Sequence, residues 1–296
     1  GVSLTGVSGN AGITVGSSNS ASVNLTDNDT ATFTIDNQSG GESGSRVFNV
    51  TLDNPIDANV TLDVTFAGVS ATGSAGGIGA DFDNTTRQVT FTAGSTTPSN
   101  TISVPVTPDT IVELTETFTA NLAVATSTPT GDRSGRISTS DTGTGTITDD
   151  DSATVRIRNG SNAAEPSTAG SFIVELTAAS STATVVQIAI DLLTTADSPD
   201  DGTITGTGLS LDLGTGLGTV TFAAGVTSRT INVNVTDDDI VEGTETVILN
   251  LTGIQSGDPQ ITRDGDPALL TATVDVTDDD TAQVSIAAGT TATEAG

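Results

Sequence analysis

The sequence has no cysteine, histidine, lysine, methionine, tryptophan or tyrosine. Without cysteine there is no disulfide, thiol nucleophile or thiolate metal site, and without histidine the commonest general base and transition-metal ligand are missing. All eight basic residues are arginine, so neither a Schiff base nor a lysine–asparagine cross-link can form. Eight scattered phenylalanines cannot build the aromatic surface on which carbohydrates or nucleobases stack.

Positive charge is also scarce, and the formal net charge is -29. A chain so acidic repels nucleic acid and anionic membranes and attracts cations. There is no apolar run of membrane-spanning length and no visible signal peptide. We therefore predict no nucleic-acid partner and no direct membrane insertion. Abundant threonine, serine, glycine and aspartate without cysteine are typical of an extracellular or cell-surface bacterial protein.

The chain is a tandem repeat, and its clearest element is an acidic stretch between two alternating apolar segments. The stretch INVNVTDDDIVEGTETVILNL, at 231–251, recurs 129 residues earlier as TISVPVTPDTIVELTETFTANL. Aspartate-rich junctions begin at Thr26, Thr148 and Thr277, and each leads into an alternating strand. We predict the end of an earlier unit at 1–29, complete units at 30–151 and 152–280, and the first strand of a later unit at 281–296.

Each complete unit contains about seven short segments in which apolar residues alternate with polar ones. This period of two indicates strands with one buried face, and no helical stripe is present. The predicted fold class is all-β, with tandem seven-stranded antiparallel β-sandwiches. Pro105 cannot donate to a ladder, so its strand is expected at an edge or a bulge. Ser70 to Gly79 and Gly202 to Gly218 are interpreted as flexible insertions.

Four acidic features recur at corresponding places in both units. They are a first-loop glutamate (Glu42, Glu165), an aspartate ten residues before a core phenylalanine (Asp81, Asp212), a hairpin group (Asp109, Glu113, Glu116; Asp238, Glu242, Glu245) and a closing run (Asp149, Asp150, Asp151; Asp278, Asp279, Asp280). Alternate loops of a seven-stranded sandwich emerge at the same end, so these residues are expected to converge. Two carboxylates about 5 Å apart repel by roughly 3 kcal/mol at an effective dielectric of about 20. Convergence therefore predicts bound cations, and Ca²⁺ is the ion that takes six to eight hard oxygen ligands.

The alternative is that these acidic loops are simply solvated and keep the protein soluble. Recurrence at fixed offsets from core residues argues against it, because the rest of the loops varies freely. Asp83, Asp200, Asp237 and Asp239 have no counterpart in the other unit, and we interpret them as surface charge.

These motifs resemble the Calx-β family. The resemblance is carried by VTFTAG, VPVTPDTIVELTETF and TITDDD in the first unit and by VTFAAG, VNVTDDDIVEGTETV and DVTDDD in the second. It covers nearly the whole chain and implies an immunoglobulin-like sandwich whose distal loops bind Ca²⁺ through the four acidic features above. The family's Asp-Tyr becomes Asp81-Phe82 and Asp212-Leu213 here. Pro108 replaces an acidic residue, so we expect fewer ions in the first unit than in the second.

The closing run of each unit leads directly into the next, so Ca²⁺ bound there would stiffen the junction. We hypothesise a Ca²⁺-binding structural repeat segment of an extracellular adhesin, stalk, filament or surface layer, with neighbouring repeats or copies of itself as partners. One alternative is a filament subunit joined to other copies by strand exchange, and another is a Ca²⁺-sensing module. We do not expect an enzyme, because a paired-carboxylate glycosidase needs an aromatic-walled pocket that this composition does not supply.

Overall fold

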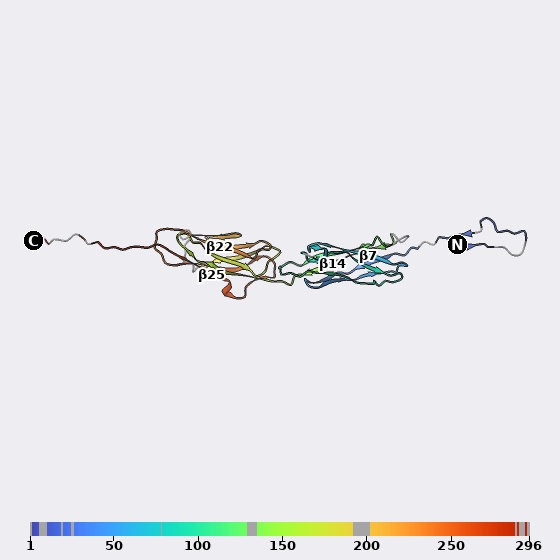
Figure 1. Cartoon of the computed structure of the whole chain (residues 1–296), viewed down its shortest axis with the longest axis horizontal. Helices are drawn as coiled ribbons and strands as arrows, with labels where there is room; N and C mark the ends of the chain where they lie inside the picture. The colour runs from blue at the N-terminus through green and yellow to red at the C-terminus, as the bar shows by residue number, and fades with distance from the viewer. Residues whose placement is uncertain are drawn as a thin grey trace.

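The computed structural model describes residues 2–5, 11–18, 20–24, 27–77, 79–128, 135–191, 202–287, 289 and 294. Two β-rich units lie end to end along the long axis, with the N- and C-termini at opposite ends (Figure 1). Within the described residues the only helical elements are the short 3-10 turns η1 (Ala75–Gly77) and η3 (Pro267–Leu269). No described helix has the length and apolar character that crossing a membrane requires. The all-β prediction is therefore confirmed.

The first unit is a sandwich of two layers. One layer is a sheet in the order β10-β7-β12-β14-β4, and the other combines β11-β5 with β13-β3-β6. The strands are β3 (Ala31–Ile35), β4 (Gln38–Gly41), β5 (Ser45–Phe48), β6 (Val50–Leu52), β7 (Val60–Gly68), β8 (Gly73–Ser74), β9 (Phe82–Asp83), β10 (Arg87–Phe91), β11 (Ile102–Pro105), β12 (Glu116–Val124), β13 (Ile137–Ser138) and β14 (Thr142–Thr148). Ahead of this unit, β1 (Val2–Ser3) pairs with β2 (Ser20–Ala21).

The second unit repeats this plan with sheets in the orders β19-β22-β17-β15-β24 and β16-β25-β23-β18-β21-β20. Its strands are β15 (Ala153–Ser161), β16 (Ala163–Ala164), β17 (Gly170–Leu176), β18 (Thr184–Ile190), β19 (Gly202–Gly206), β20 (Leu209–Asp212), β21 (Leu217–Phe222), β22 (Ser228–Val235), β23 (Glu245–Ser256), β24 (Ile261–Arg263) and β25 (Thr271–Thr277). The strands β22 and β25 of this unit, and β7 and β14 of the first, are labelled in Figure 1.

The cores form as the alternation predicts. All eight phenylalanines are buried, six of them in the first unit. Phe82 stacks on Phe118 with ring centroids 4.2 Å apart. Gly145 lies opposite Phe118 on the neighbouring strand, where an added Cβ would come within 2.2 Å of the ring. The glycine-rich character of the closing strand is therefore a packing requirement.

Three features refine the predicted sandwich. Strand β11, which ends in Pro105, pairs with β5 alone in the described sheets, so the edge prediction is confirmed. The edge pairs β14–β4, β13–β3, β15–β24 and β16–β25 are parallel. Gly202 to Gly218 is not a flexible insertion: it forms β19 and β20, which turn at Gly208 (φ 78°) and extend both sheets.

Candidate metal centres

Acidic residues gather at the end of each unit from which the chain leaves. In the first unit they come from the β4 end, the β11–β12 loop and the run after β14. The pairing of the strands brings these segments together, because Thr148 lies opposite Gly41 and Ile147 lies opposite Glu116. The sequence prediction that these loops converge is thus met by the register of three neighbouring strands.

Two groups of carboxylates form at this end of the first unit. Oxygens of Glu42, Asp149 and Asp151 lie within 4.8 Å of one another, and so do oxygens of Asp81, Glu113 and Glu116. A pocket at this end is lined by Glu42, Asp81, Thr107, Asp109, Glu113, Leu114, Glu116 and Ile147. Asp109 therefore borders the groups without being a member, and Asp150 is exposed beside them.

Backbone hydrogen bonds fix the shape of the acidic loop between β11 and β12, for which we keep the name acidic hairpin although the two strands lie in different layers and do not pair with each other. The amide of Ile111 donates to Asp109 Oδ1 at 2.7 Å, and the amide of Glu113 donates to Asp149 Oδ2 at 2.8 Å. Asp149 Oδ1 also accepts from the amide of Asp151 at 3.0 Å. The closing run and the hairpin are thereby held against each other, with several carboxylate oxygens turned to the same space.

The electrostatics of the first unit's groups favour either protonation or a bound cation. Burial raises the pKa of Glu42 to about 7, and the charges of Asp149 and Asp109 add to the shift. Burial, followed by a hydrogen bond and charge repulsion from Asp81, raises the pKa of Glu116 to about 8. Burial likewise raises the pKa values of Glu113 and Asp151. Burial disfavours the charged form of these acids and the neighbouring charges add to the effect, so a bound cation would stabilise their deprotonated forms.

Unpartnered buried oxygens in the acidic loops could be satisfied by a bound metal ion. Glu42 Oε2, Asp151 Oδ2 and Asp280 Oδ2 are buried without a hydrogen-bond partner. Among the described residues, arginines form ion pairs with other carboxylates, namely Asp27, Asp83 and Glu175. Buried acceptor oxygens require a donor or a cation, and a set made only of carboxylates suits a hard ion with many oxygen ligands.

The second unit repeats the hairpin geometry with a single carboxylate group. The amide of Ile240 donates to Asp238 Oδ1 at 2.6 Å, and the amide of Glu242 donates to Asp278 Oδ2 at 2.7 Å. Oxygens of Glu165, Asp278 and Asp279 lie within 4.8 Å of one another. A pocket here is lined by Glu165, Glu242, Gly243, Glu245, Val276 and Asp278.

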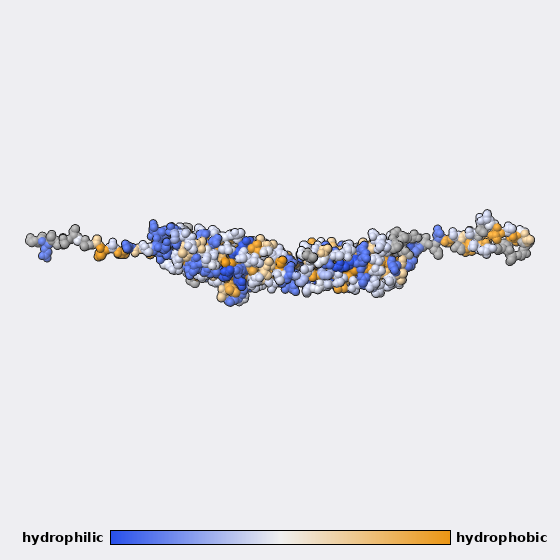
Figure 2. Space-filling model, viewed as in Figure 1, coloured by the Kyte–Doolittle hydropathy of each residue, from blue (hydrophilic) through white to orange (hydrophobic). Residues whose placement is uncertain are grey.

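The pKa values of the acidic residues at this end of the second unit shift according to burial and to nearby amides and charges. Burial and the charge of Asp278 raise the pKa of Glu165 to about 6. Backbone amides of Glu242 and Asp280 lower the pKa of Asp278, whereas burial raises that of Asp280. This end of the unit is hydrophilic on its surface (Figure 2).

Asp212 does not occupy the place that Asp81 occupies. Asp81 lies in the loop before β9 and accepts a hydrogen bond from the Thr72 amide at 2.5 Å. Asp212 ends β20 and instead caps a turn, accepting from the Gly214 amide at 2.9 Å. The described residues thus give two carboxylate groups in the first unit and one in the second. These groups do not count bound ions, and residues 192–201 of the second unit lie outside the described residues, so the expectation of fewer ions in the first unit stays a prediction.

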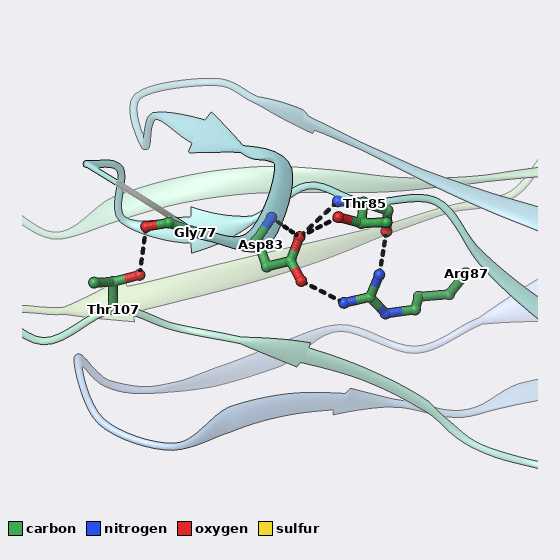
Figure 3. A network of polar contacts seen from close by, with 6 residues as sticks. Gly77, Asp83, Thr85, Arg87 and Thr107 are labelled. Carbon is green, nitrogen blue, oxygen red and sulfur yellow. Dashed lines mark hydrogen bonds and ion pairs between the residues drawn. The ribbon is translucent and has the colours of Figure 1, made fainter.

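Asp83 is a structural carboxylate and not surface charge (Figure 3). It is 9% exposed and accepts from the Gly76 amide at 2.8 Å, the Thr85 amide at 2.9 Å and the Thr85 hydroxyl at 2.5 Å. Its other oxygen pairs with Arg87 at 2.6 Å. These hydrogen bonds outweigh burial and lower its pKa. Asp237 and Asp239 are exposed, as expected, and Asp200 lies outside the described residues.

The acidic end of the first unit contacts the second unit. Val112 is fully buried and packs within the hydrophobic core of the second unit. Its amide donates to the Ala179 carbonyl at 2.8 Å, and its carbonyl accepts from the Ser181 amide at 3.0 Å. Gln260 Nε2 donates to Asp149 Oδ2 at 2.7 Å. Val112 and Gln260 were not predicted to have a role, although an apolar pair at 111–112 inside an acidic loop was a usable signal.

Comparison with known proteins identifies the domain family of both units. The sequence model of the Calx-beta domain matches residues 26–151 and 149–280. A crystal structure of CBD12 from CALX1.2 aligns at 14% identity over 83% of this chain and 99% of that chain, with a TM-score of 0.33. An apo-form Calx CBD1 domain aligns at 21% identity over 43% of this chain and 99% of that chain, with a TM-score of 0.31. No curated protein matches the sequence.

Proposed function

The chain belongs to the Calx-beta domain family, and from this premise we propose that it is a Ca²⁺-binding structural segment whose ions stiffen the junction between its units. We place it in an extracellular adhesin, stalk, filament or surface layer. The observation that carries the proposal is the position of the first unit's carboxylate groups, which border the contact with the second unit. Asp149 belongs to such a group and also accepts a hydrogen bond from Gln260.

Ca²⁺ bound between Glu42, Asp149 and Asp151 would connect three segments of the first unit. These segments are the β4 end, the closing run and, through the Glu113 amide on Asp149, the acidic hairpin. The same hairpin carries Val112 into the second unit. The second unit contacts the first at Val112 in this hairpin and at Asp149 in the closing run. An ion that holds the hairpin against the closing run therefore fixes the positions of these two contacts relative to each other.

An extracellular location is supported by composition and by the character of the sites. Extracellular Ca²⁺ modules work with dissociation constants of about 10⁻⁴ to 10⁻³ M, which suits open carboxylate groups at loop ends. A chain without disulfides gains stability there from ion binding by mass action. The absence of cysteine in this sequence is consistent with such dependence.

A second candidate function is self-assembly by strand exchange, and exposed apolar residues at both ends favour it. In the N-terminal segment Val2 and Leu4 are 76% and 65% exposed. In the C-terminal segment Val284 and Ile286 are 98% and 100% exposed. Alternating apolar residues without a sheet to cover them are suited to strand addition.

Thermal unfolding combined with small-angle scattering tests the main proposal, in millimolar Ca²⁺ and again in chelator. We expect a lower melting temperature in chelator together with a change from an extended rod to a broader range of shapes. Mg²⁺ at the same concentration serves as the control, because it demands a stricter octahedral geometry. An unchanged melting temperature and scattering profile would show that the acidic loops are solvated charge, and would overturn the proposal.

A further inference from the structure

One side chain of the second unit reaches a carboxylate group of the first. Gln260 Nε2 donates to Asp149 Oδ2 at 2.7 Å and to the Asp149 carbonyl at 3.5 Å. The second unit holds Gln260 in this place, because its amide donates to Asp258 Oδ1 at 2.8 Å and its carbonyl accepts from the Ala153 amide at 3.4 Å. A neutral side chain of one unit is therefore fixed against an acidic residue of the other.

The first unit has a charged residue at the place that corresponds to Gln260. The Arg136 carbonyl accepts from the Ala31 amide at 2.9 Å, as the Gln260 carbonyl accepts from the Ala153 amide. Each alanine also pairs in parallel with the residue that follows the arginine or the glutamine. The same backbone geometry therefore presents arginine in one unit and glutamine in the other.

The carboxylates that these two side chains contact also correspond. Asp27 and Asp149 each lie four residues before the strand that follows an aspartate-rich junction. The Oδ1 atom of each accepts from the amide two residues further along the chain, at 3.0 Å in both places. Arg136 Nη1 lies 3.1 Å from Asp27 Oδ2, and Gln260 Nε2 lies 2.7 Å from Asp149 Oδ2. The first aspartate thus receives a cation from the protein, and the second receives only an amide.

The missing positive charge matters at Asp149 because of its neighbours. Asp149 is 8% exposed, and its oxygens lie close to those of Glu42 and Asp151. Glu42 is 5% exposed, and its Oε2 atom and Asp151 Oδ2 are buried without a hydrogen-bond partner. Arg46, four residues after Glu42, donates to backbone carbonyls. Among the described ion pairs, none joins an arginine to these three carboxylates, so their charge is left for a cation from solution.

From these observations we propose that Gln260 makes the junction between the two units depend on a divalent cation, and that an arginine at this position would replace the ion. The inference rests on the proposed function, since it concerns ions at the same junction. Glutamine adds no charge, so the group around Asp149 stays open to an ion. A guanidinium there would neutralise part of the acidic charge and repel a divalent ion. Arg136 shows that the corresponding backbone accommodates the longer side chain.

Exchange of Gln260 for arginine and for glutamate tests the inference. In chelator we expect Q260R to melt at a higher temperature than the natural chain and to keep a more extended scattering profile, whereas Q260E should melt at a lower temperature. Calorimetric titration of Q260R should show a loss of Ca²⁺ affinity at the junction on the order of tenfold or more, because a unit charge would face a divalent ion at close range. Q187R is the matched control, since it adds the same charge on the exposed side of β18 (Thr184–Ile190), and should titrate like the natural chain.

The rise in melting temperature that Ca²⁺ produces separates this inference from the proposed function. We expect the rise to be smallest in Q260R, intermediate in the natural chain and largest in Q260E. Equal rises in Q260R and Q260E, with the natural chain still stabilised by Ca²⁺, would overturn the role of Gln260 and leave the proposed function standing. A natural chain that Ca²⁺ does not stabilise would overturn both.

A double variant tests whether Gln260 acts through the ion bound at Glu42. Glu42→Gln alone removes a ligand from that group, so adding Q260R should lower the Ca²⁺ affinity little further. The loss in E42Q/Q260R should therefore be clearly smaller than the sum of the losses in the two single variants, both measured by calorimetric titration. Additive losses would place the effect of Gln260 at a different ion and would overturn the inference.

Discussion

At the scale of single residues, the same carboxylate chemistry serves different purposes according to its neighbours. Glu175 is paired with Arg156 and Arg158, and its pKa is lowered. Asp83 is held by amides, a hydroxyl and one arginine. Glu42 faces other carboxylates, and its pKa rises to about 7. Only the last environment is improved by a cation, so substitutions at these positions should respond to Ca²⁺ differently.

Replacing Glu42 with glutamine should change stability in opposite directions with and without Ca²⁺. In chelator E42Q removes one repelling charge and supplies amide donors near Asp149 and Asp151, so we expect a higher melting temperature than in the natural protein. In Ca²⁺ the same substitution removes a ligand. Loss of an outer-shell partner alone lowers metal affinity roughly tenfold, so we expect the Ca²⁺ affinity of E42Q to fall by at least that factor. Calorimetric titration and thermal unfolding measure both effects. The exposed D237N is the control, and equal behaviour of the two variants would contradict the assignment.

Replacing Asp83 with asparagine should destabilise the first unit by the same amount in Ca²⁺ and in chelator. We expect a loss of about 1.5–3 kcal/mol, the range for hydrogen bonds to a charged group. Because the Arg87 side chain is partly exposed, the ion pair itself contributes near the lower end of this energy range. D63N is the matched control, since Asp63 accepts one hydrogen bond from Gln88 on an exposed face. A D83N effect that appears only in Ca²⁺ would place Asp83 in a metal centre instead.

The sequence identified most of the acidic residues that gather, because they keep fixed offsets from buried strand residues. It located Glu42, Glu116 and Asp149 in this way, and the structure brings each into a carboxylate group. Counting back from the core phenylalanine did not locate an equivalent of Asp81 in the second unit. Asp212 lies at the end of β20, in the β19–β20 hairpin, whereas Asp81 lies in the loop before β9. Counting also failed for Asp83, whose partners Gly76, Thr85 and Arg87 are defined by a local turn and leave no repeating pattern.

At the scale of elements, the acidic hairpin between β11 and β12 combines two tasks. Its backbone positions carboxylates through Asp109 and Asp149, and its tip enters the second unit. Alternation predicted the flanking strands well because each has one buried face. It could not predict the burial of Val112, since the side chain is covered by a different unit and not by its own sheet.

Val112→Ala should weaken the second unit more than the first. The change removes two methyl groups from a closed core, for which we expect a loss of about 1–3 kcal/mol. The equivalent V241A is the matched control, because Val241 is 50% exposed and its truncation leaves no cavity in an isolated chain. Hydrogen-exchange rates of the β17 and β18 amides in the second unit, compared with those of the β7 amides in the first, would show which unit loses stability. Equal effects of V112A and V241A would contradict the role of Val112 as part of the second core.

At the scale of the whole molecule, the two units touch through few contacts. The units meet through the Val112 tip, the Gln260–Asp149 hydrogen bond and the chain from Asp149 to Ala153. The first unit's carboxylate groups lie at this junction, whereas the second unit's group lies at the far end, near the exit of the chain (Figure 1). Ions in the two units are therefore expected to differ in effect, since only those of the first unit lie where they influence the angle between units.

The pH dependence of stability that is expected in chelator should largely disappear in saturating Ca²⁺. Without ions, Glu42 and Glu116 titrate at about 7 and about 8 in the folded protein, against an ordinary value of 4.5. The folded protein then holds protons that the unfolded chain has released, so the free energy of unfolding falls as the pH rises from about 4.5 to about 8. With Ca²⁺ the ions need the deprotonated carboxylates, so stabilisation by Ca²⁺ grows over the same window.

Melting temperatures measured across this window in both buffers would check this difference in pH dependence. We expect the curves for Ca²⁺ and chelator to meet near pH 5 and to diverge toward pH 8, because protons and Ca²⁺ compete for the same oxygens. In the double variant E42Q/E116Q the chelator curve should lose much of its slope, with the remainder coming from Glu113, Asp151 and Glu165, whose pKa values are also raised. Parallel curves in the natural protein would mean that Ca²⁺ binds elsewhere. A flat chelator curve would mean that the converging carboxylates are relieved by solvent, and the rod would then owe its stiffness to Val112 and the short connection alone.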